Sequence, residues 1–414
     1  MLKESVEVLV IGAGPSGCVA ASYLHNNGVK VKVVERSKFP RFVIGESLIP
    51  RVMDHFDEAG LLDALLVKDF EKKFGARFIR GEELCVFDFS IKFGEGWDWT
   101  WQVPRADFDN TLAQEVIRKG IDLEFETEVL DVVFNGTDSV TTVRNKEGET
   151  RQIEAKFIID SSGYGRVLPK ILKLDAPSSI PENSSMFTHV KEIKRPEGVE
   201  GTQITFDILE TEVWLWVIPF SNGNTSIGVV GPTKYINSIG GANNTEALKK
   251  IINKSDFYRD RFEGVDFLFE PNKIENYSCS VTQLYGPGYT LTGNASEFLD
   301  PVFSSGVCFA TESGMLSAKL FLREKNGEKV DWEVEYSDYM RRGVNVFATY
   351  VKEWYTGNLQ TLFFHRPENP EVKEKICSVL AGYVWDEENP FVKKHDRVIK
   401  TMAYMLQNEK SAQE

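Results

Sequence analysis

The N-terminal part of the chain follows an order of apolar and polar positions that predicts a β-strand, an α-helix and a second β-strand. An apolar run (VEVLVI, residues 6–11) leads into a glycine-rich turn and a helical stretch, and a second apolar run (VKVV, residues 31–34) ends at an acidic residue. Strands that alternate with helices are typical of a parallel sheet covered by helices. We therefore expect an α/β fold that begins with such a unit.

The glycines of this turn form the pattern Gly12-x-Gly14-x-x-Gly17. Gly12 permits the tight turn, Gly14 lets the backbone approach a pyrophosphate, and Gly17 lets the helix pack close to the strand. The N-terminus of the helix then binds the phosphates. Glu35, after the second strand, can accept hydrogen bonds from the adenosine ribose hydroxyls. An ordinary glycine-rich turn would give the glycines alone. Here a strand, the glycine turn, a helix, a second strand and an acidic residue follow in order, which predicts a Rossmann-like, three-layer domain that binds a dinucleotide.

Two later segments return to the N-terminal sheet, which indicates that the nucleotide-binding domain is interrupted. Residues 157–163 (FIIDSSG) form an apolar strand that ends in an aspartate and a glycine, and residues 289–321 give a strand, a loop and a helix. Between them, residues 204–230 predict strands joined by a hairpin turn at 221–224. We expect a discontinuous nucleotide-binding domain (1–60, 105–165 and 285–330), a substrate domain with a mixed or antiparallel sheet (61–104 and 166–284) and a helical C-terminal region (331–414).

Aromatic residues mark two further segments. Trp97, Trp99 and Trp101 alternate along the chain, which predicts that they share one face of a strand. That face is a substrate wall or simply core, and large aromatic side chains most often serve burial. From residue 333 onward, aromatic residues spaced mostly three or four apart predict a helical packing layer. Other local patterns predict an amphipathic helix closed by glycine (104–120), a strand (121–134) and a hairpin turn (145–149).

Composition and charge limit the class of protein. The chain has 414 residues, of which 42% are hydrophobic, enough for a large core. Its net charge of −14 disfavours nucleic acid or an anionic membrane surface as the main ligand and favours a small molecule or a neutral partner. The five cysteines are scattered without a C-x-x-C pair, so neither a disulfide framework nor a zinc site is indicated. With no apolar run long enough to span a membrane, we expect a cytoplasmic protein.

These residues resemble a known superfamily, the FAD-dependent aromatic hydroxylases and geranylgeranyl reductases, over nearly the whole chain. Its nucleotide glycines match the Gly12 pattern, its R-x-x-F-D segment matches residues 105–109, and its Asp-Gly motif matches residues 160–163. Its later G-D-A and D-P motifs correspond to 293–295 (GNA) and 300–301, so an amide that can still bind a ribityl hydroxyl replaces a carboxylate. The resemblance implies FAD, bound by Gly12, Gly14, Pro15, Ser16, Gly17, Glu35, Arg36, Arg41, Ser47, Arg105, Val129, Asp160, Gly163, Asn294, Asp300, Pro301 and Gly306.

Within this superfamily the chain resembles the flavin-dependent halogenases. Residues 214–219 (WLWVIP) match their signature W-x-W-x-I-P, and two tryptophans at this spacing share one strand face. The resemblance implies that Trp214 and Trp216 line the route between flavin and substrate, whereas a core strand ending at a proline would look alike. Lys73 aligns with the halogenase lysine that stands between the flavin and substrate cavities and directs hypohalous acid. Lys72 is the neighbouring alternative, and a surface lysine would give the same pattern.

The resemblance also implies a halide site and limits the substrate. In halogenases the backbone amides that align with Ser305 and Gly306 bind chloride beside the flavin, and a turn ahead of a helix exposes N–H groups suited to an anion. Tryptophan halogenases carry a glutamate where this chain has Phe303, which argues against free tryptophan. The pattern is closer to halogenases of phenols and pyrroles, some of which act on substrates tethered to a carrier protein. Glu46, in the segment over the flavin, is either a site acid or an ion-pair partner of Arg41.

Together these features predict an FAD-dependent oxidoreductase, a two-component halogenase that acts on an electron-rich aromatic ring through a flavin hydroperoxide. The chain has no second dinucleotide fingerprint, so a separate flavin reductase is expected to supply reduced FAD, with chloride or bromide as co-substrate. The alternatives are an alkene or prenyl reductase, disfavoured by Ile44 where such reductases have cysteine, and a flavin monooxygenase. His25 and His189 show no metal spacing and are expected to be structural. The residues implied to be catalytic are Lys73, Trp214, Trp216 and Glu46.

Overall fold

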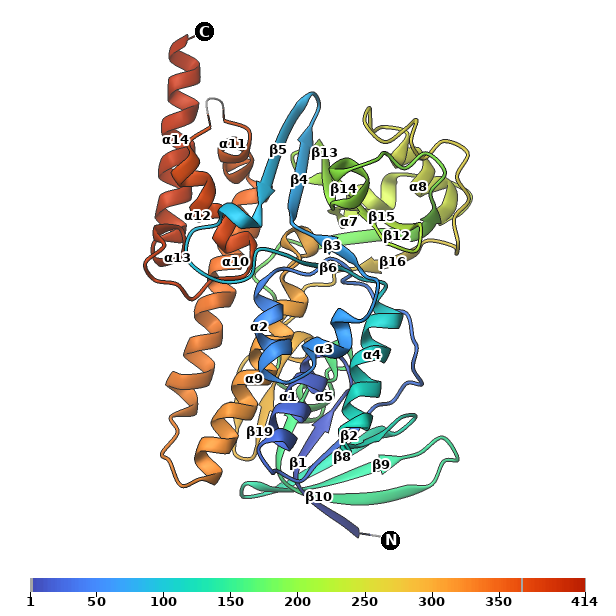
Figure 1. Ribbon diagram of the computed structural model, residues 1–414, viewed down its shortest axis with the longest axis vertical. Helices are drawn as coiled ribbons and strands as arrows, with labels where there is room; N and C mark the ends of the chain where they lie inside the picture. The colour runs from blue at the N-terminus through green and yellow to red at the C-terminus, as the bar shows by residue number, and fades with distance from the viewer. Residues whose placement is uncertain (1–2, 366–367, 414) are drawn as a thin grey trace.

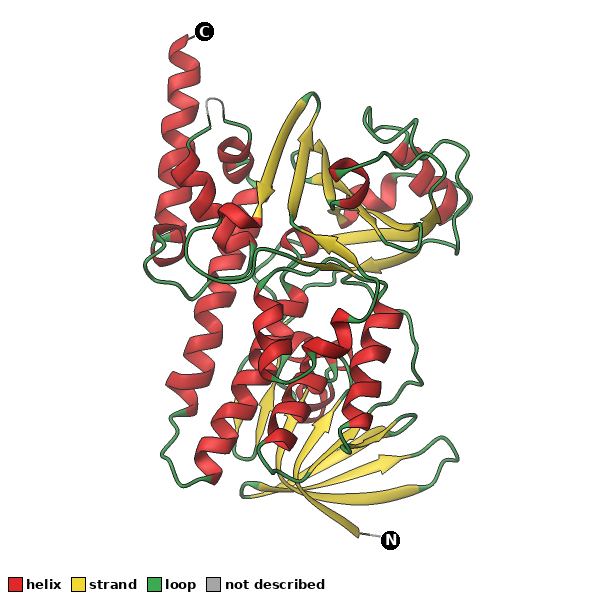
Figure 2. Ribbon diagram, viewed as in Figure 1, coloured by secondary structure: helices red, strands yellow, loops and turns green. Residues whose placement is uncertain are grey.

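The computed structural model describes residues 3–365 and 368–413, and the chain forms two halves stacked along the long axis of the molecule (Figure 1). The lower half holds the N-terminus and one sheet, and the upper half holds a second sheet (Figure 2). The C-terminal helices run along one side of both halves. Among the described residues, none of the helices combines the length and hydropathy that a membrane span needs.

The lower sheet is built around β1 (Lys3–Ile11), the first apolar run of the sequence. β1 pairs in parallel with β2 (Val31–Val34) on one side and with β10 (Thr150–Asp160) on the other. The expected return of residues 157–163 to the N-terminal sheet is thus confirmed. The sheet order is β18 (Tyr285–Gly286), β19 (Tyr289–Leu291), β10, β1, β2 and β7 (Asp122–Glu124), and the hairpin of β8 (Glu128–Asn135) and β9 (Asp138–Arg144) continues from β10.

Helices pack closely on this sheet and on one another. α1 (Pro15–Asn26) lies against α9 (Gly306–Lys325), where a Cβ on Gly314 would stand 2.6 Å from the carbonyl oxygen of Ser16. Only glycine permits helices to approach so closely. α4 (Arg105–Arg118), the predicted amphipathic helix, packs on the other side of α1 and is followed by Gly120 at φ +88°. The α/β architecture expected from the sequence is confirmed.

The upper sheet is mixed, as expected, and the strand of the W-x-W-x-I-P signature lies near its middle. That strand, β14 (Val213–Pro219), is buried on both faces. Leu215 and Val217 belong to a cluster covered by α8 (Asn244–Ile252), whereas Trp214 and Trp216 join the main core on the opposite face. The strand order is β16 (Asn272–Glu275), β12 (Asn183–Lys191), β15 (Asn224–Pro232), β14, β13 (Thr205–Glu210), β4 (Gly75–Arg80) and β5 (Glu83–Asp88).

The C-terminal helices form the expected packing layer, and their aromatic residues reach the core. Tyr350 and Trp354 of α10 are fully buried and meet the ring of Phe303 edge-on, at 6.1 and 5.8 Å between centroids. The layer therefore covers the turn that precedes α9. Its helices are α10 (Tyr339–Tyr355), α11 (Asn358–Phe363), α12 (Pro370–Leu380), α13 (Pro390–Lys393) and α14 (His395–Gln413).

Two local predictions are wrong. The alternating tryptophans do not share a strand, because only β6 (Thr100–Gln102) is extended, and Trp97 and Trp99 lie in the preceding loop. Each ring meets the next one edge to face along the chain, and of the three only Trp101 is fully buried. The strand expected at 121–134 breaks at Glu126, whose φ of +54° does not fit a strand. The helix within 104–120 and the hairpin turns at 145–149 and 221–224 are confirmed.

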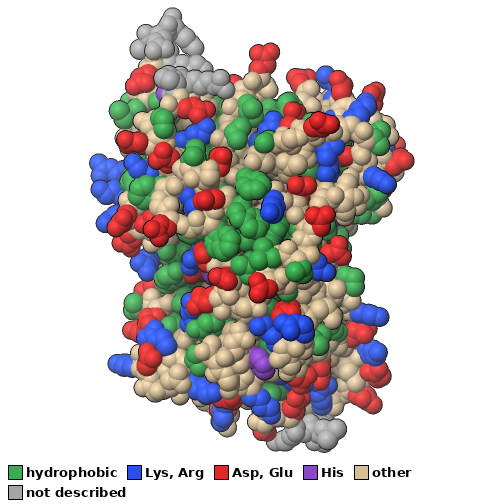
Figure 3. Space-filling view, in the orientation of Figure 1, with side chains coloured by type: hydrophobic (Ala, Val, Ile, Leu, Met, Phe, Trp, Pro, Cys, Tyr) green, Lys and Arg blue, Asp and Glu red, His purple; other side chains and the backbone are tan. Residues whose placement is uncertain are grey.

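β6 pairs with β3 (Glu71–Lys73), and this small ribbon lies where the two halves meet (Figure 1). Hydrophobic side chains gather at the same height on this face of the molecule (Figure 3). The ribbon carries both lysines that the sequence proposes for the site. The pairing places Lys73 opposite Thr100, inside the molecule, and Lys72 opposite Trp101 with its own side chain outside.

Candidate cofactor and active site

A cavity of about 490 Å³ extends between the two sheets, and its size is typical of a cofactor site. Glu35 lies at its lower end, and Trp214 and Trp216 form part of its upper wall. A smaller cavity of about 250 Å³ adjoins it and shares Glu35 and Arg36. Of the predicted FAD-binding residues, the larger cavity is lined by Gly14, Pro15, Ser16, Glu35, Arg36, Arg41, Ser47, Arg105, Gly163, Asn294, Pro301 and Gly306, and the smaller by Gly12, Glu35, Arg36 and Val129.

The glycine turn has the geometry that a dinucleotide requires. Gly12 has φ +102°, and a Cβ there would stand 2.4 Å from the carbonyl oxygen of Ser161. A Cβ on Gly17 would stand 2.0 Å from the carbonyl oxygen of Gly12, so the helix could not pack on the strand with any larger residue. Gly14 lines the cavity, and the nearest atom to its added Cβ is 3.9 Å away on Arg41. The first amides of α1, which have no partner within the helix, are therefore open to phosphate.

Glu35 is held by the backbone at the lower end of the cavity. Its Oε2 accepts a hydrogen bond from the amide of Ala13 at 3.0 Å, and its Oε1 accepts one from the amide of Ser37 at 2.8 Å. Each oxygen keeps further lone pairs for a ribose hydroxyl. The glycine turn, this fixed carboxylate and the volume of the cavity fit FAD.

The R-x-x-F-D segment anchors the loop above the cavity. Arg105 and Asp109 lie one helical turn apart on α4 and form an ion pair at 2.8 Å. Arg105 also donates to the carbonyl oxygens of Ile44 and Gly45, both at 3.1 Å. Arg41 binds the other oxygen of Asp109 at 3.0 Å. One buried carboxylate therefore fixes both arginines and, through them, the shape of the cavity rim.

Of the two alternatives for Glu46, the ion pair with Arg41 is wrong, because Arg41 pairs with Asp109. Glu46 instead pairs with His189, whose Nε2 lies 2.6 Å from Glu46 Oε1. The sequence predicted a purely structural role for His189 and gave no sign of this contact with Glu46. His189 alternates with Phe187 along β12, and Phe187 contacts the ring of Trp216. Alternation with a residue of the cavity wall is the sequence signal that could have identified His189.

Lys73 is sealed inside the molecule beside the cavity. Its side chain is 2% exposed, and its Nζ donates to Ser47 Oγ at 2.9 Å and to the carbonyl oxygen of Leu48 at 2.7 Å. Burial lowers the pKa of this amine to about 7. Lys73 does not line the larger cavity, but Ser47 does, so one hydroxyl separates the amine from that space. Lys72 is exposed and lies over the ring of Trp99.

The two signature tryptophans line the cavity and are fixed by hydrogen bonds. Trp216 Nε1 donates to Ser226 Oγ at 3.0 Å, and Trp214 Nε1 donates to Tyr355 Oη at 3.2 Å. Tyr355 in turn donates to Asp300 at 3.0 Å. No sequence pattern singles out Tyr355, and only the approach of α10 to the upper sheet brings it to this wall.

Some predicted residues lie beside the cavities rather than in their walls. The carboxylate of Asp300 accepts hydrogen bonds from Tyr277, Tyr355 and Asn183, and the carboxylate of Asp160 accepts the amides of Ser162 and Leu168. Burial raises the pKa of both carboxyl groups. Through these hydrogen bonds Asp160 and Asp300 fix the surrounding loops. Gly17, Asp160, Asp300 and Ser305 line neither of the two cavities, whereas Gly306 begins α9 at the larger one.

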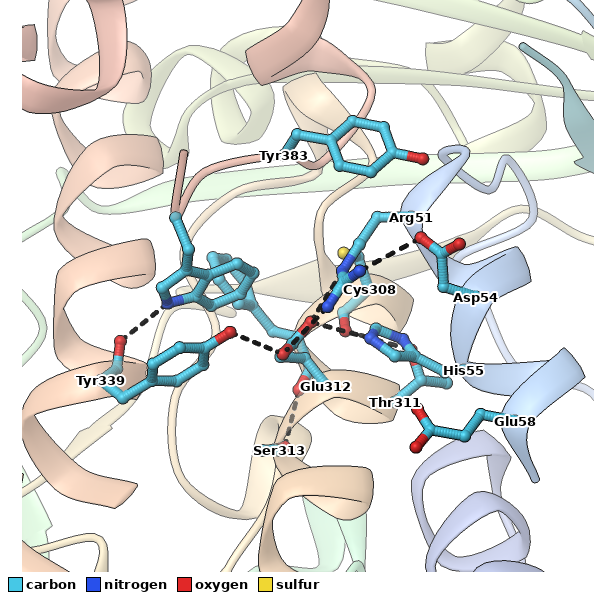
Figure 4. Close-up of polar contacts among 12 residues, drawn as sticks. Arg51, Asp54, His55, Glu58, Cys308, Thr311, Glu312, Ser313, Tyr339 and Tyr383 are labelled. Atoms are coloured by element: carbon cyan, nitrogen blue, oxygen red, sulfur yellow. Dashed lines mark hydrogen bonds and ion pairs between the residues drawn. The ribbon is translucent and has the colours of Figure 1, made fainter. Parts of the chain in front are cut away.

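A buried polar cluster ties α9 to the C-terminal helices (Figure 4). Glu312 of α9 lies 2.7 Å from His55 and 3.0 Å from Arg51, both on α2 (Arg51–Glu58), and accepts a hydrogen bond from Tyr339 of α10 at 2.9 Å. Burial alone disfavours the charge of Glu312, but the hydrogen bond from His55 and the charge of Arg51 outweigh it and lower the pKa to about 2. The cluster fixes the helix whose N-terminus meets the cavity.

Comparisons with known proteins agree with this geometry. Residues 5–257 match the family described as FAD binding domain. A 1H-pyrrole-2-carbonyl-(peptidyl-carrier protein) brominase from Pseudoalteromonas luteoviolacea (strain 2ta16) is 26% identical over 393 residues, which cover 93% of this chain and 94% of the relative. Among solved structures, a flavoprotein/dehydrogenase from Cytophaga hutchinsonii has a TM-score of 0.96 and 52% identity, covering 98% of this chain and 100% of that one. A flavin-dependent brominase has a TM-score of 0.83 and 23% identity, covering 98% and 100%, and shows the fold.

The fold, the cavity and the relatives define an FAD-dependent oxidoreductase. More particularly, the chain belongs to the FAD binding domain family, and the curated relatives that it resembles over most of its length include halogenases of carrier-bound pyrroles.

Proposed function

We propose that this protein is a two-component halogenase, which uses chloride or bromide to halogenate an electron-rich aromatic ring of the phenol or pyrrole type. The observation that carries the proposal is the position of Lys73, a fully buried amine one hydroxyl away from the cofactor cavity. With a pKa of about 7, a large fraction of this amine is neutral at physiological pH. An amine in that state can hydrogen-bond hypohalous acid or form a haloamine, and thus direct the halogen to the substrate.

The residues around the cavity divide the remaining tasks. When bound, reduced FAD supplies electrons for the conversion of oxygen and halide into hypohalous acid. The N-terminus of α1 holds the pyrophosphate, and Glu35 holds the ribose. Trp214 and Trp216 keep water and the organic substrate away from the reacting end of the cofactor. Asn294 lines the cavity where it can bind a ribityl hydroxyl.

The halide site is proposed at the start of α9. Ser305 is the residue before the helix, and Gly306 is its first residue and lines the cavity. The N–H groups at the start of a helix have no partner within it and face the positive end of the helix dipole. An anion held by these two amides would stand beside the cofactor.

The substrate class follows from the surroundings of Phe303 and from the relatives. Phe303 is buried between Tyr350 and Trp354, so this position offers no carboxylate where tryptophan halogenases carry a glutamate. The brominase relative acts on a pyrrole carried by a peptidyl-carrier protein. We propose that this chain takes a small aromatic substrate of that kind, tethered to a carrier protein, and receives reduced FAD from a separate reductase.

The test supplies FAD reduced by light, oxygen, and chloride or bromide, with phenols and with pyrrole-2-carboxylic acid, free or as a thioester on a carrier protein. Mass spectra of the products should show the isotope pattern of chlorine or bromine. The Lys73→Met variant should bind FAD and yield no halogenated product, whereas the Lys72→Met control should match the wild type. Halogenation by Lys73→Met at the wild-type rate would remove the observation that carries the proposal.

The structural neighbour described as a flavoprotein/dehydrogenase favours a second candidate, a reaction that moves hydrogen without halogen. The same assay separates these candidates when an alkene substrate is added and when NADPH is tested in place of light-reduced FAD. If an alkene substrate is converted to a product with two added hydrogens and no halogen, the protein is a reductase and the halogenase proposal is replaced. Rapid NADPH oxidation that depends on the aromatic substrate and needs no partner would replace it by a single-component monooxygenase.

A further inference from the structure

The reaction proposed above has a proton requirement. Reduced FAD with its two hydrogens, oxygen, one halide ion and one proton give oxidised FAD, hypohalous acid and water. FAD and halide each supply two of the four electrons that reduce oxygen. Of the three hydrogens in the products, two come from reduced FAD, and the third must enter the cavity from outside in every turnover. The following inference rests on the proposed function and names the groups that supply this proton.

Few side chains of the cavity wall can deliver a proton. The arginines of the wall do not release theirs. Glu35 is fixed through both oxygens by backbone amides at the ribose end. Tyr164 is 41% exposed, and its phenol is a far weaker acid than a carboxyl group. Lys73 is sealed at 2% exposure, and its described hydrogen bonds lead to Ser47 and Leu48 rather than to solvent, so a proton lost from it is not replaced from the surface.

The pair of Glu46 and His189 has the required geometry. Glu46 lines the cavity, and its side chain is completely buried. Its Oε1 is 2.6 Å from His189 Nε2, while its Oε2 has no partner among the described residues and carries no contact with solvent. A buried carboxylate oxygen without a partner calls for a donor or acceptor on a bound molecule. His189 keeps 14% of its side chain exposed, which gives the pair a route to water.

The surroundings leave proton exchange to these two groups. The ring of His189 packs against Phe42, Phe220 and Phe269 at 5.3 to 5.5 Å between centroids, and Phe42 is 45% exposed at the rim. On β15, the strand paired with β12, the residue opposite His189 is the uncharged Ser226. Charged groups on the packed elements already have partners, namely Arg41 and Arg105 with Asp109, and Glu270 with Thr245.

We propose that His189 and Glu46 form a proton relay from solvent to the cavity. Glu46 Oε2–H gives its proton to the oxygen atom that leaves as water, so that an O–H bond breaks on Glu46 and one forms on the leaving oxygen. His189, with a proton on both ring nitrogens, then gives its Nε2 proton to Oε1, and the neutral imidazole that remains takes up a proton from solvent. A half-turn of the neutral Glu46 carboxyl group brings the new O–H to the Oε2 position for the next turnover. Glu46 is a catalytic residue in this scheme, whereas His189 acts through Glu46 and is a positioning residue.

The test compares wild type with His189→Gln and Glu46→Gln, using FAD reduced by light, bromide and phenol as the probes. Glutamine keeps a hydrogen-bonding amide in place of each group but carries no exchangeable acid. We expect the bromination rate of His189→Gln to fall about 10²-fold below wild type at about pH 8, the size of a lost general acid, and to approach wild type at about pH 6, where protons are abundant. Added imidazole should restore the rate at the higher pH.

Two further measurements separate a relay from a structural role. FAD affinity, followed by quenching of flavin fluorescence, should stay within about twofold of wild type in both variants, because the relay does not hold the cofactor. His25→Gln, a histidine of α1 outside the cavity wall, is the matched control and should leave rate and pH profile unchanged.

Specific outcomes overturn the relay. A loss of rate by one constant factor at every pH, without rescue by imidazole, would assign the pair a structural role. Loss of FAD binding in both variants would assign it to cofactor binding. If wild-type protein shows no bromide-dependent product at any pH, the proposed function fails, and the relay fails with it. If wild type is active and both variants match it, the relay alone fails.

Discussion

Replacing Lys73 by methionine is expected to stabilise the protein near pH 7 while it abolishes halogenation. Methionine has similar length and can fill the same space without a charge. Burial lowers the pKa of the lysine amine from its ordinary 10.5 to about 7. Between these pH values the unfolded chain binds a proton at Lys73 that the folded chain does not. Folded-state stability therefore rises with pH in this window, by about 1.4 kcal/mol per pH unit, and falls as pH decreases toward 7.

The size of the effect follows from that window. At pH 7 the buried amine destabilises the folded state by about 4 kcal/mol relative to an unperturbed lysine. Methionine removes this cost but also the hydrogen bonds to Ser47 and Leu48, each of which contributes about 1 kcal/mol. The net expectation is a gain of about 2 kcal/mol in the free energy of unfolding at pH 7. Near pH 9 the penalty is about 2 kcal/mol, so the two proteins should be equally stable.

The assay is urea unfolding without added FAD, followed by tryptophan fluorescence at both pH values. Lys72→Met is the matched control, and because Lys72 is exposed it should change stability by no more than about 0.5 kcal/mol. A Lys73→Met protein that is less stable than wild type at pH 7, or that differs from wild type equally at both pH values, would refute the reasoning.

Three further predictions follow from the same structure. Gly17→Ala should abolish FAD binding in a fluorescence titration, because its Cβ would stand 2.0 Å from a backbone carbonyl oxygen, and binding within twofold of wild type would contradict this. Glu312→Gln should remove about 3 kcal/mol of stability that is present above pH 4.5 and lost as pH falls toward 2, so an unchanged acid-unfolding curve would count against the cluster. Tyr355→Phe should cost about 1–3 kcal/mol in urea unfolding, because it leaves the buried Trp214 Nε1 unpaired. Tyr350→Phe is its control and should be neutral, since no described partner binds that hydroxyl.

The parts of the fold that could be predicted from sequence depend on neighbours along the chain. Although the carbonyl oxygen that crowds Gly12 belongs to the distant Ser161, the apolar runs of β1 and β2 and the glycines between them specify a strand, a turn and a helix locally. The steric demand on Gly17, for example, comes from the carbonyl oxygen of Gly12. The hairpin turns at 145–149 and 221–224 are local for the same reason. The wrong prediction at Trp97 and Trp99 also came from a local pattern. The alternation there resembles a strand, but among the described residues the strand begins only at Thr100.

Contacts between distant segments could not be predicted in this way. The sequence left two roles open for Glu46, a catalytic role or an ion pair with Arg41. In the structure Arg41 pairs with Asp109, and Glu46 pairs with His189, which lies on a strand more than a hundred positions away. No pattern near Glu46 or Arg41 reveals these partners. Tyr355 lies far along the chain from Trp214 and meets it because α10 packs beside the upper sheet. Such pairings depend on how whole sheets and helices pack.

The sequence by itself determined the dinucleotide turn, the α/β class and the family resemblance, because these depend on residue types at fixed short spacing. The tertiary structure decided which lysine is buried, where Glu46 finds its partner and how the C-terminal helices close the wall. The physical reason is desolvation. An amine or a carboxylate has ordinary chemistry at the surface, and only packing of distant segments around Lys73 and Glu46 removes water and gives them the environment that the proposed chemistry needs.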